Sequence, residues 1–180
     1  MDVKVLLLII TALLIIVNPV MAGNREGAVT LTPFFGAQGF PNGEEHLDAD
    51  WKWGIRGGYN FTRNLGAEIV YGVISTVHDP EEADCKLYQY GADILYHFRP
   101  DKDLVPFAAV GFGGYTVDYN SDVGISDETN AYFNYGGGVE YSLADWLALR
   151  VDFRHAIFMD NGDSALEGTL GLKFQIGGRK

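Results

Sequence analysis

The stretch LEGTLGLKFQI, Leu166–Ile176, alternates between apolar and polar side chains almost without interruption. One face carries Leu166, Gly168, Leu170, Leu172, Phe174 and Ile176, and the other carries Glu167, Thr169, Gly171, Lys173 and Gln175. A period of two predicts a β-strand rather than a helix. In a soluble sandwich the apolar face would point to a protein core, whereas in a membrane barrel it would point to lipid and the polar face would line the interior. The rest of the chain decides between these two structures.

The N-terminus predicts export from the cytoplasm. One basic residue precedes thirteen uncharged residues, Val5–Val17, and Val20 and Ala22 occupy the small-residue positions before a cleavage site. This pattern is typical of a secretory signal peptide. A transmembrane anchor is the alternative, but a helix of this length spans only about 20 Å, short of the roughly 30 Å hydrocarbon core. We therefore predict a signal peptide over residues 1–22 and one domain over residues 23–180.

Composition excludes several kinds of partner and site. The net charge of −11 argues against a nucleic-acid partner, because the phosphates would repel an acidic protein. Cys85 is the only cysteine, which excludes an internal disulfide and a metal cluster built on cysteines. Fourteen of the 24 acidic residues fall in the stretches 40–50, 76–86, 118–129 and 157–165. We interpret these acidic residues as a solvated surface. The alternative is divalent-cation binding, but the spacing of a calcium-binding loop is not present. We therefore predict no metal site and no cofactor.

Seven further stretches repeat the alternation of the opening segment. They are Ala28–Gln38, Trp51–Asn60, Leu65–Ser75, Leu87–Phe98, Val105–Val117, Asn130–Tyr141 and Trp146–Ala156. Each has ten to thirteen residues, whereas strands of soluble proteins usually have about 5–6 and tilted membrane strands about 9–11. The stretch Val105–Val117 is apolar on both faces, so its orientation stays open.

The connections between these stretches alternate in length. FTRN, RPDKD and SLAD, at 61–64, 99–103 and 142–145, are short, and the connections that alternate with them are longer and polar. Bacterial outer-membrane barrels have short periplasmic turns and long outer loops. The sequence therefore predicts an all-β fold, an eight-stranded antiparallel transmembrane β-barrel over residues 27–177 with both termini in the periplasm, in the outer membrane of a Gram-negative bacterium.

The predicted inward face carries five basic and five acidic side chains. They are Lys52, Arg56, Glu68, Asp93, Glu140, Arg150, Asp152, Arg154, Glu167 and Lys173. The interior of an eight-stranded barrel is only wide enough for side chains to fill it. Charges enclosed there must pair or retain water. The balance of five against five predicts an ion-pair network that plugs the lumen, and on the outside Trp51, Trp53 and Trp146 are expected at the membrane interface.

Taken together, these motifs resemble the outer-membrane β-barrel family typified by the OmpA transmembrane domain. The most specific stretches are VPFAAVGFGGY, at 105–115, and YGGGVEYSLADWLALRVDFRHA, at 135–156. The resemblance implies that Glu68, Glu140 and Arg150 occupy the positions of a gate-like ion-pair network, with Asp93 in place of the family's lumenal lysine.

The resemblance also implies a set of partners. The chain end is similar to the C-terminal signal that the barrel-assembly machinery reads, and the matching residues are Thr169, Gly171, Phe174 and Ile176. Short, barrel-only members such as OmpX-like proteins imply periplasmic chaperones during assembly, outer-membrane lipid and lipopolysaccharide as surroundings, and a monomer.

The expected function is a structural or surface-interaction role without catalysis. One alternative is a narrow pore for small solutes, as in OmpW-like relatives, and another is a lipid A-modifying enzyme. Deacylases of this barrel size use a His-x-Ser pair, but Ile157 stands at the serine position after His155, and Ser164 falls in a predicted loop. A nucleophile and its base must lie within hydrogen-bond reach, so we predict no catalytic residue. His97 is expected to be a hydrogen-bonded lumen residue.

Overall fold

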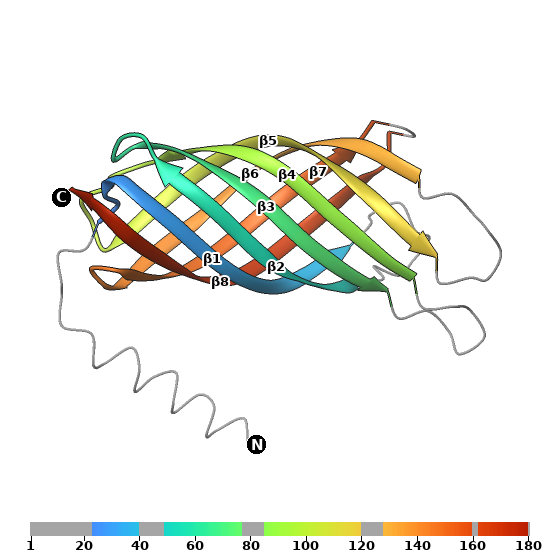
Figure 1. The fold of residues 1–180 in the computed structure, drawn as a ribbon, viewed down its shortest axis with the longest axis horizontal. Coiled ribbons are helices and arrows are strands. Elements are labelled where there is room, and N and C mark those ends of the chain that lie inside the picture. The colour runs from blue at the N-terminus through green and yellow to red at the C-terminus, as the bar shows by residue number, and fades with distance from the viewer. Residues whose placement is uncertain (1–22, 40–48, 77–84, 120–127, 160–161, 180) are drawn as a thin grey trace, which may run out of the picture.

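Strands cover almost the whole of the described chain. The computed structural model describes residues 23–39, 49–76, 85–119, 128–159 and 162–179, and the predicted signal peptide lies outside them. The strands are β1 (Glu26–Gly39), β2 (Ala49–Asn60), β3 (Leu65–Thr76), β4 (Cys85–His97), β5 (Leu104–Tyr119), β6 (Glu128–Ala144), β7 (Leu147–Phe158) and β8 (Ser164–Arg179). Each pairs antiparallel with the next, and β1 pairs with β8 to close the barrel (Figure 1). The predicted eight-stranded antiparallel barrel is confirmed.

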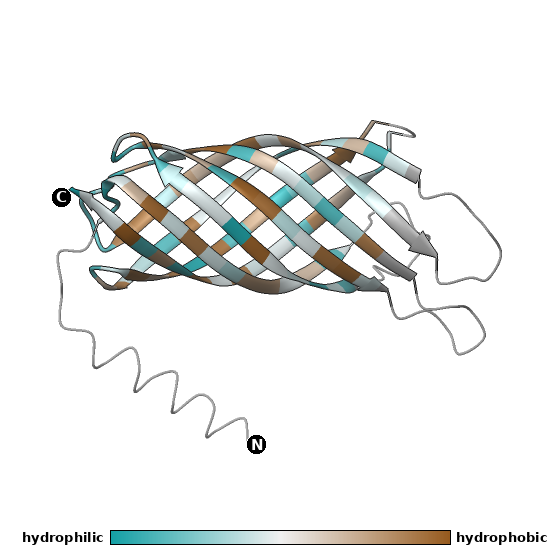
Figure 2. Cartoon of the chain, in the orientation of Figure 1, coloured by the Kyte–Doolittle hydropathy of each residue, from teal (hydrophilic) through white to brown (hydrophobic). Residues whose placement is uncertain are grey.

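The alternation in the sequence becomes the inside and the outside of the barrel. On β8, Leu166, Leu170 and Ile176 are more than half exposed, while Glu167 and Lys173 are buried. The other strands repeat this pattern, visible as alternating brown and teal bands in Figure 2. The exposed face is therefore apolar and the enclosed face is polar, which is the arrangement that lipid around a barrel requires.

The orientation of β5, which the sequence left open, is set by its contacts inside the barrel. Val105, Phe107 and Ala109 are buried, and Phe112 points outward with 61% of its surface exposed. Phe107 and Ala109 pack with Leu95 of β4 in a small apolar cluster within the lumen. A strand with two apolar faces can be accommodated because part of the lumen is itself apolar.

Three short turns and the C-terminus share one end of the barrel, hereafter the turn end (Figure 1, left). In the first turn the Thr62 hydroxyl accepts hydrogen bonds from the backbone N–H groups of Asn64 and Leu65. The predicted connection SLAD is wrong in extent, because its first three residues belong to β6 and only Asp145 and Trp146 form the turn. The register shifts at Ser142 and Ala144, and this irregularity lets β6 continue further than predicted.

The longer predicted connections fall mainly outside the described residues, and with them most of the acidic side chains. Within the described ranges, no helix has the length and apolar character needed to cross a membrane.

Candidate functional site

All ten charged side chains predicted for the inward face lie inside the barrel. Their exposed fractions are 7% or less, and they are Lys52, Arg56, Glu68, Asp93, Glu140, Arg150, Asp152, Arg154, Glu167 and Lys173. Each lies within 4 Å of a side chain of opposite charge. Because an enclosed charge without a partner is very costly, this pairing is the condition for the barrel to hold them. We call the ten side chains the lumen network.

Arg150 on β7 is the centre of the lumen network. Its two terminal nitrogens donate to the two carboxylate oxygens of Glu68 at 2.7 and 2.9 Å, and its Nε donates to Asp152 at 2.6 Å. The guanidinium group also lies over the ring of Phe107, 4.5 Å from the ring centroid. Arginine suits this position because its planar fork can bind two carboxylates at once.

Glu140, which the family resemblance places in the same network, is a more distant partner of Arg150 than Glu68 and Asp152 are. Glu140 lies directly opposite Arg150 in the β6–β7 register, but the nearest nitrogen–oxygen distance between them is 3.9 Å. Glu140 is held instead by Lys173, whose Nζ donates to both of its carboxylate oxygens at 2.7 and 2.9 Å. Asp152 is therefore the closer carboxylate beside Arg150, and Glu140 is bound chiefly by Lys173.

Two acidic residues face each other across adjacent strands. Glu68 and Asp93 are direct partners in the β3–β4 register, and like charges in such positions destabilise a sheet. Arg154 lies between them, 3.3 Å from Glu68 and 3.2 Å from Asp93. Asn134 also donates to Asp93 at 2.8 Å. Asp93, which stands in place of the family's lumenal lysine, is thus held by β7 and β6 rather than left unpaired.

Gly111 on β5 makes room for that carboxylate. A Cβ atom at position 111 would lie 1.8 Å from Oδ1 of Asp93 and 2.4 Å from the backbone oxygen of Ala92. No larger residue fits there unless β4 or the Asp93 side chain moves.

At the end opposite the turn end, the lumen network continues through Lys52, Arg56 and Glu167. The Lys52 ammonium donates to both Gln89 and Glu167. Arg56 donates to Thr169 at 3.1 Å and to Glu167 at 3.4 Å. Arg56 also lies 3.6 Å from Asp152. It therefore connects the Lys52–Glu167 pair to the ion pairs around Arg150.

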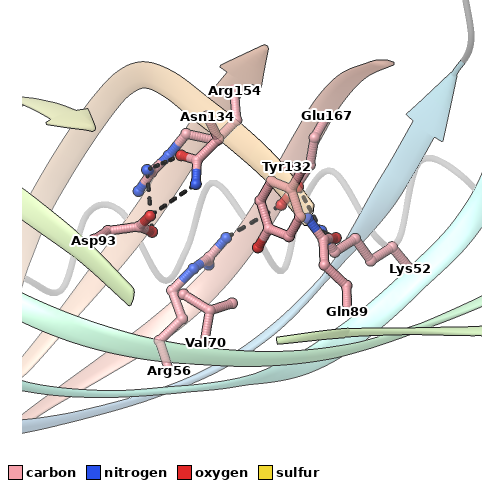
Figure 3. A pocket seen from close by; sticks show the side chains of 9 residues that line it. All are labelled: Lys52, Arg56, Val70, Gln89, Asp93, Tyr132, Asn134, Arg154 and Glu167. Atoms are coloured by element: carbon pink, nitrogen blue, oxygen red, sulfur yellow. Dashed lines mark hydrogen bonds and ion pairs between the residues drawn. The ribbon is translucent and has the colours of Figure 1, made fainter. Parts of the chain in front are cut away.

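A small cavity lies between these groups. It is lined by Lys52, Arg56, Val70, Gln89, Asp93, Tyr132, Asn134, Arg154 and Glu167 (Figure 3). Nε and one terminal nitrogen of Arg56 are buried and form no hydrogen bond with any residue that the structure describes. A polar lining with free donors is the environment in which proteins hold ordered water.

His97 is buried at the turn end of the lumen, as predicted, but the predicted hydrogen bond is wrong. Within the described ranges, neither ring nitrogen has a hydrogen-bond partner, and Nε2 lies 3.6 Å from Glu140. The closer partner of that carboxylate is Lys173, which donates to both of its oxygens.

The three tryptophans predicted at the membrane interface all point outward. Trp51, Trp53 and Trp146 are 56%, 55% and 55% exposed. Trp51 stacks on Phe35, with ring centroids 5.2 Å apart, and Trp146 stacks on Phe174 at 6.0 Å. Trp146 is in the turn between β6 and β7, and the other two lie near the start of β2, so the aromatic side chains occur toward both ends of the barrel.

The four residues of the predicted C-terminal signal divide between the two faces of β8. Thr169 is buried in the lumen, where its hydroxyl accepts the hydrogen bond from Arg56. Gly171 shares that face, because β8 alternates, and Phe174 and Ile176 lie on the outward face. β8 continues to Arg179 beyond these residues. Recognition of this segment by the assembly machinery stays a prediction.

Several neutral residues of the site were missed from the sequence. Gln89, Asn134 and Tyr132 line the cavity together with the charged side chains. The first two occupy inward positions of predicted strands, so alternation would have identified them if uncharged polar residues had been counted. Among the described residues, no group of three or more His, Cys, Asp or Glu side chains is arranged to hold a metal ion.

Comparisons with known proteins agree with this architecture. A family model described as "Outer membrane protein beta-barrel domain" matches residues 8–174, and no curated protein sequence matches this chain. The N-terminal β-barrel domain of Pseudomonas aeruginosa OprF is similar, with a TM-score of 0.62 and 18% identity over 84% of this chain and 99% of that one. Neisserial surface protein A is similar as well, with a TM-score of 0.65 and 18% identity over 83% of this chain and 96% of that one. The outer membrane enzyme PagL has a TM-score of 0.52 and 16% identity over 82% of this chain and 99% of that one.

At these identities, the solved structures establish the fold alone. The family model, in contrast, spans most of the sequence. It confirms both the resemblance and the membrane that the alternation and the loop lengths predicted. The chain belongs to the outer-membrane β-barrel domain family and is a protein of the outer membrane.

Proposed function

We propose that the protein is a non-enzymatic component of the outer membrane with a structural or surface-interaction role, and that its lumen is closed by ion pairs. The observation that carries this proposal is the continuity of the lumen network. It runs from the Lys52–Glu167 pair through Arg56, Arg154 and Arg150 to the Lys173–Glu140 pair. An ion that crossed the lumen would have to separate enclosed pairs, and breaking such a pair from one side costs several kcal/mol.

Conductance tests the closed lumen directly. We expect the purified protein, inserted into planar bilayers, to produce no frequent, stable channels. A reference porin in the same bilayers provides the positive control, and refolded samples whose gel migration changes on heating provide the check of folding. Frequent channels of constant conductance would instead establish the alternative, a narrow pore for small solutes, and the cavity between Arg56 and Asp93 would then be part of the path.

The surface role is supported by position and charge. The acidic stretches at 40–50, 76–86, 118–129 and 157–165 connect strands at the end opposite the turn end. With the turn end in the periplasm, the strand ends that these stretches connect face the cell exterior. The surroundings that we propose are outer-membrane lipid and lipopolysaccharide, around a monomer that periplasmic chaperones and the barrel-assembly machinery deliver.

The enzymatic alternative depends on His155 and Ser164. Ser164 is the first residue of β8 rather than a loop residue, and it is paired with Ile157, so it shares the outward face with His155. His155 Nδ1, however, lies 2.8 Å from the hydroxyl of Tyr135. No hydrogen bond joins the histidine to Ser164 among the bonds of the described residues, and such a bond is what an activated serine requires.

Lipid A mass spectrometry tests this alternative. We expect the lipid A of cells that express the protein to match that of cells without it, because His155 contacts Tyr135 and forms no hydrogen bond with Ser164 among the described residues. The matched variants are His155→Ala and Ser164→Ala, each checked for insertion by heat-dependent gel migration. The loss of an acyl chain that requires both side chains would contradict the non-enzymatic proposal.

A further inference from the structure

The three residues before β1 fold across the turn end of the barrel. Asn24 is only 3% exposed, although it precedes the first strand. Its backbone N–H donates to the carbonyl of Pro100 at 2.8 Å, and its side-chain amide donates to the carbonyl of Arg63 at 2.9 Å. Its side-chain oxygen accepts from Asn60 at 2.7 Å and from Lys173 at 3.3 Å.

These partners come from four different places around the opening. Asn60 ends β2, Arg63 and Pro100 belong to the turns β2–β3 and β4–β5, and Lys173 lies on β8. A single residue, through its backbone N–H and its side chain, therefore connects four places on the rim of the barrel. Because Lys173 also binds Glu140, these contacts continue into the lumen network.

Gly23 and Arg25, on either side of Asn24, also contact the turn end of the barrel. The guanidinium of Arg25 donates to the backbone carbonyl of Gln175 at 2.6 Å, and the carbonyl of Arg25 accepts from Asn60 at 3.1 Å. A Cβ atom at Gly23 would lie 1.9 Å from the Pro100 oxygen. The site that Gly23–Arg25 occupies is thus polar, and it leaves no space for a side chain at position 23.

We propose that Gly23–Arg25 is a latch that closes the periplasmic mouth of the lumen. This goes beyond the proposed function, because it assigns part of the closure of the lumen to a segment outside the strands of the barrel. The chain would acquire this latch from the first residues that follow the predicted cleavage site. The strands alone would leave the mouth open beside Asn60 and Lys173.

Thiol labelling on the two sides of the latch tests the proposal. In a Cys85→Ser background, Thr30→Cys places a reporter on the inward face of β1 near the turn end, where Thr30 is 6% exposed. Gln38→Cys places a second reporter near the other end of the same strand, where Gln38 is 1% exposed. The probe is a charged methanethiosulfonate, applied to the purified barrel in detergent.

Asn24→Ala removes the three side-chain hydrogen bonds, and Gly23→Ala keeps every polar group but blocks the site that Gly23–Arg25 occupies. We expect either change to speed labelling at Thr30→Cys roughly tenfold or more, which corresponds to about 1.4 kcal/mol in the opening equilibrium. The rate at Gln38→Cys should not change. Glu26→Ala, an exposed position next to the latch, is the matched control and should leave both rates as they are.

Two results would overturn the latch. One is an unchanged Thr30→Cys rate in both Asn24→Ala and Gly23→Ala, with folding verified by heat-dependent gel migration. The other is an equal increase at Gln38→Cys, which would show that the whole barrel loosens. Stable channels in the unmodified protein would refute the closed lumen and not the latch, because labelling compares access at one end with access at the other.

Discussion

Arg150→Ala should lower the free energy of unfolding by about 3–5 kcal/mol, the usual cost of breaking a buried ion pair from one side. The side chain is 1% exposed and donates to both oxygens of Glu68 as well as to Asp152. Its removal leaves two enclosed carboxylates with fewer cations around them. The loss should be large because water cannot readily solvate these carboxylates in a lumen that side chains fill.

Double substitutions separate the partners of Arg150. Arg150→Ala combined with Glu68→Ala should cost less than the sum of the two single changes, by roughly 0.5–3 kcal/mol, since the two residues share an interaction. The coupling with Glu140→Ala should be smaller. The contact from Arg150 to Glu68 is bidentate, whereas Glu140 is 3.9 Å away and bound to Lys173.

The measurement is reversible urea unfolding of the barrel in lipid vesicles. Arg179→Ala is the matched control, because it removes the same charge from an exposed position at the end of β8, and it should stay within about 0.5 kcal/mol of the unmodified protein. If Arg150→Ala stayed within the same limit, the central position of Arg150 in the lumen network would be contradicted.

The lumen network was predictable as a set because a strand has a period of exactly two residues. A slip of one residue would move every inward side chain to the lipid face, so the apolar face of Leu166–Ile176 fixes the direction of Glu167 and Lys173. The same reasoning applies on β7, where Leu149, Val151 and Phe153 place Arg150 inside. Charge and alternation together were sufficient to assign all ten residues to the interior.

The partners within the network were not predictable in the same way. Alternation gives the face of a residue but not its height in the barrel relative to other strands, which depends on the stagger between strands. Glu140 and Arg150 are neighbours in register, yet each binds a different partner. Asn24 lies outside any strand and its role arises only from the turns around it. Where both faces are apolar, as on β5, alternation carries no information.

Gly111→Ala should cost at least about 3 kcal/mol, although it adds a single methyl group. Overpacking of a tight site costs about 1–3 kcal/mol, and here the added atom would lie 1.8 Å from the Asp93 carboxylate and 2.4 Å from the backbone oxygen of Ala92. Asp93 would have to leave Arg154 and Asn134, which hold it at 3.2 and 2.8 Å. The steric clash would thus also cost electrostatic energy, because the displaced Asp93 would lose its cation while it still lies opposite Glu68 on the neighbouring strand.

Gly57→Ala is the matched control for this prediction, measured by the same urea unfolding in vesicles. A Cβ atom at Gly57 would find Ile69 at 3.7 Å, an ordinary contact, so this variant should be neutral or gain up to about 1 kcal/mol from the reduced freedom of the unfolded chain. In an Asp93→Ala background, Gly111→Ala should cost less than in the unmodified protein, because the displaced carboxylate is gone. Equal stability of Gly111→Ala and Gly57→Ala would show that β4 and β5 do not approach each other as closely as the Asp93 site requires.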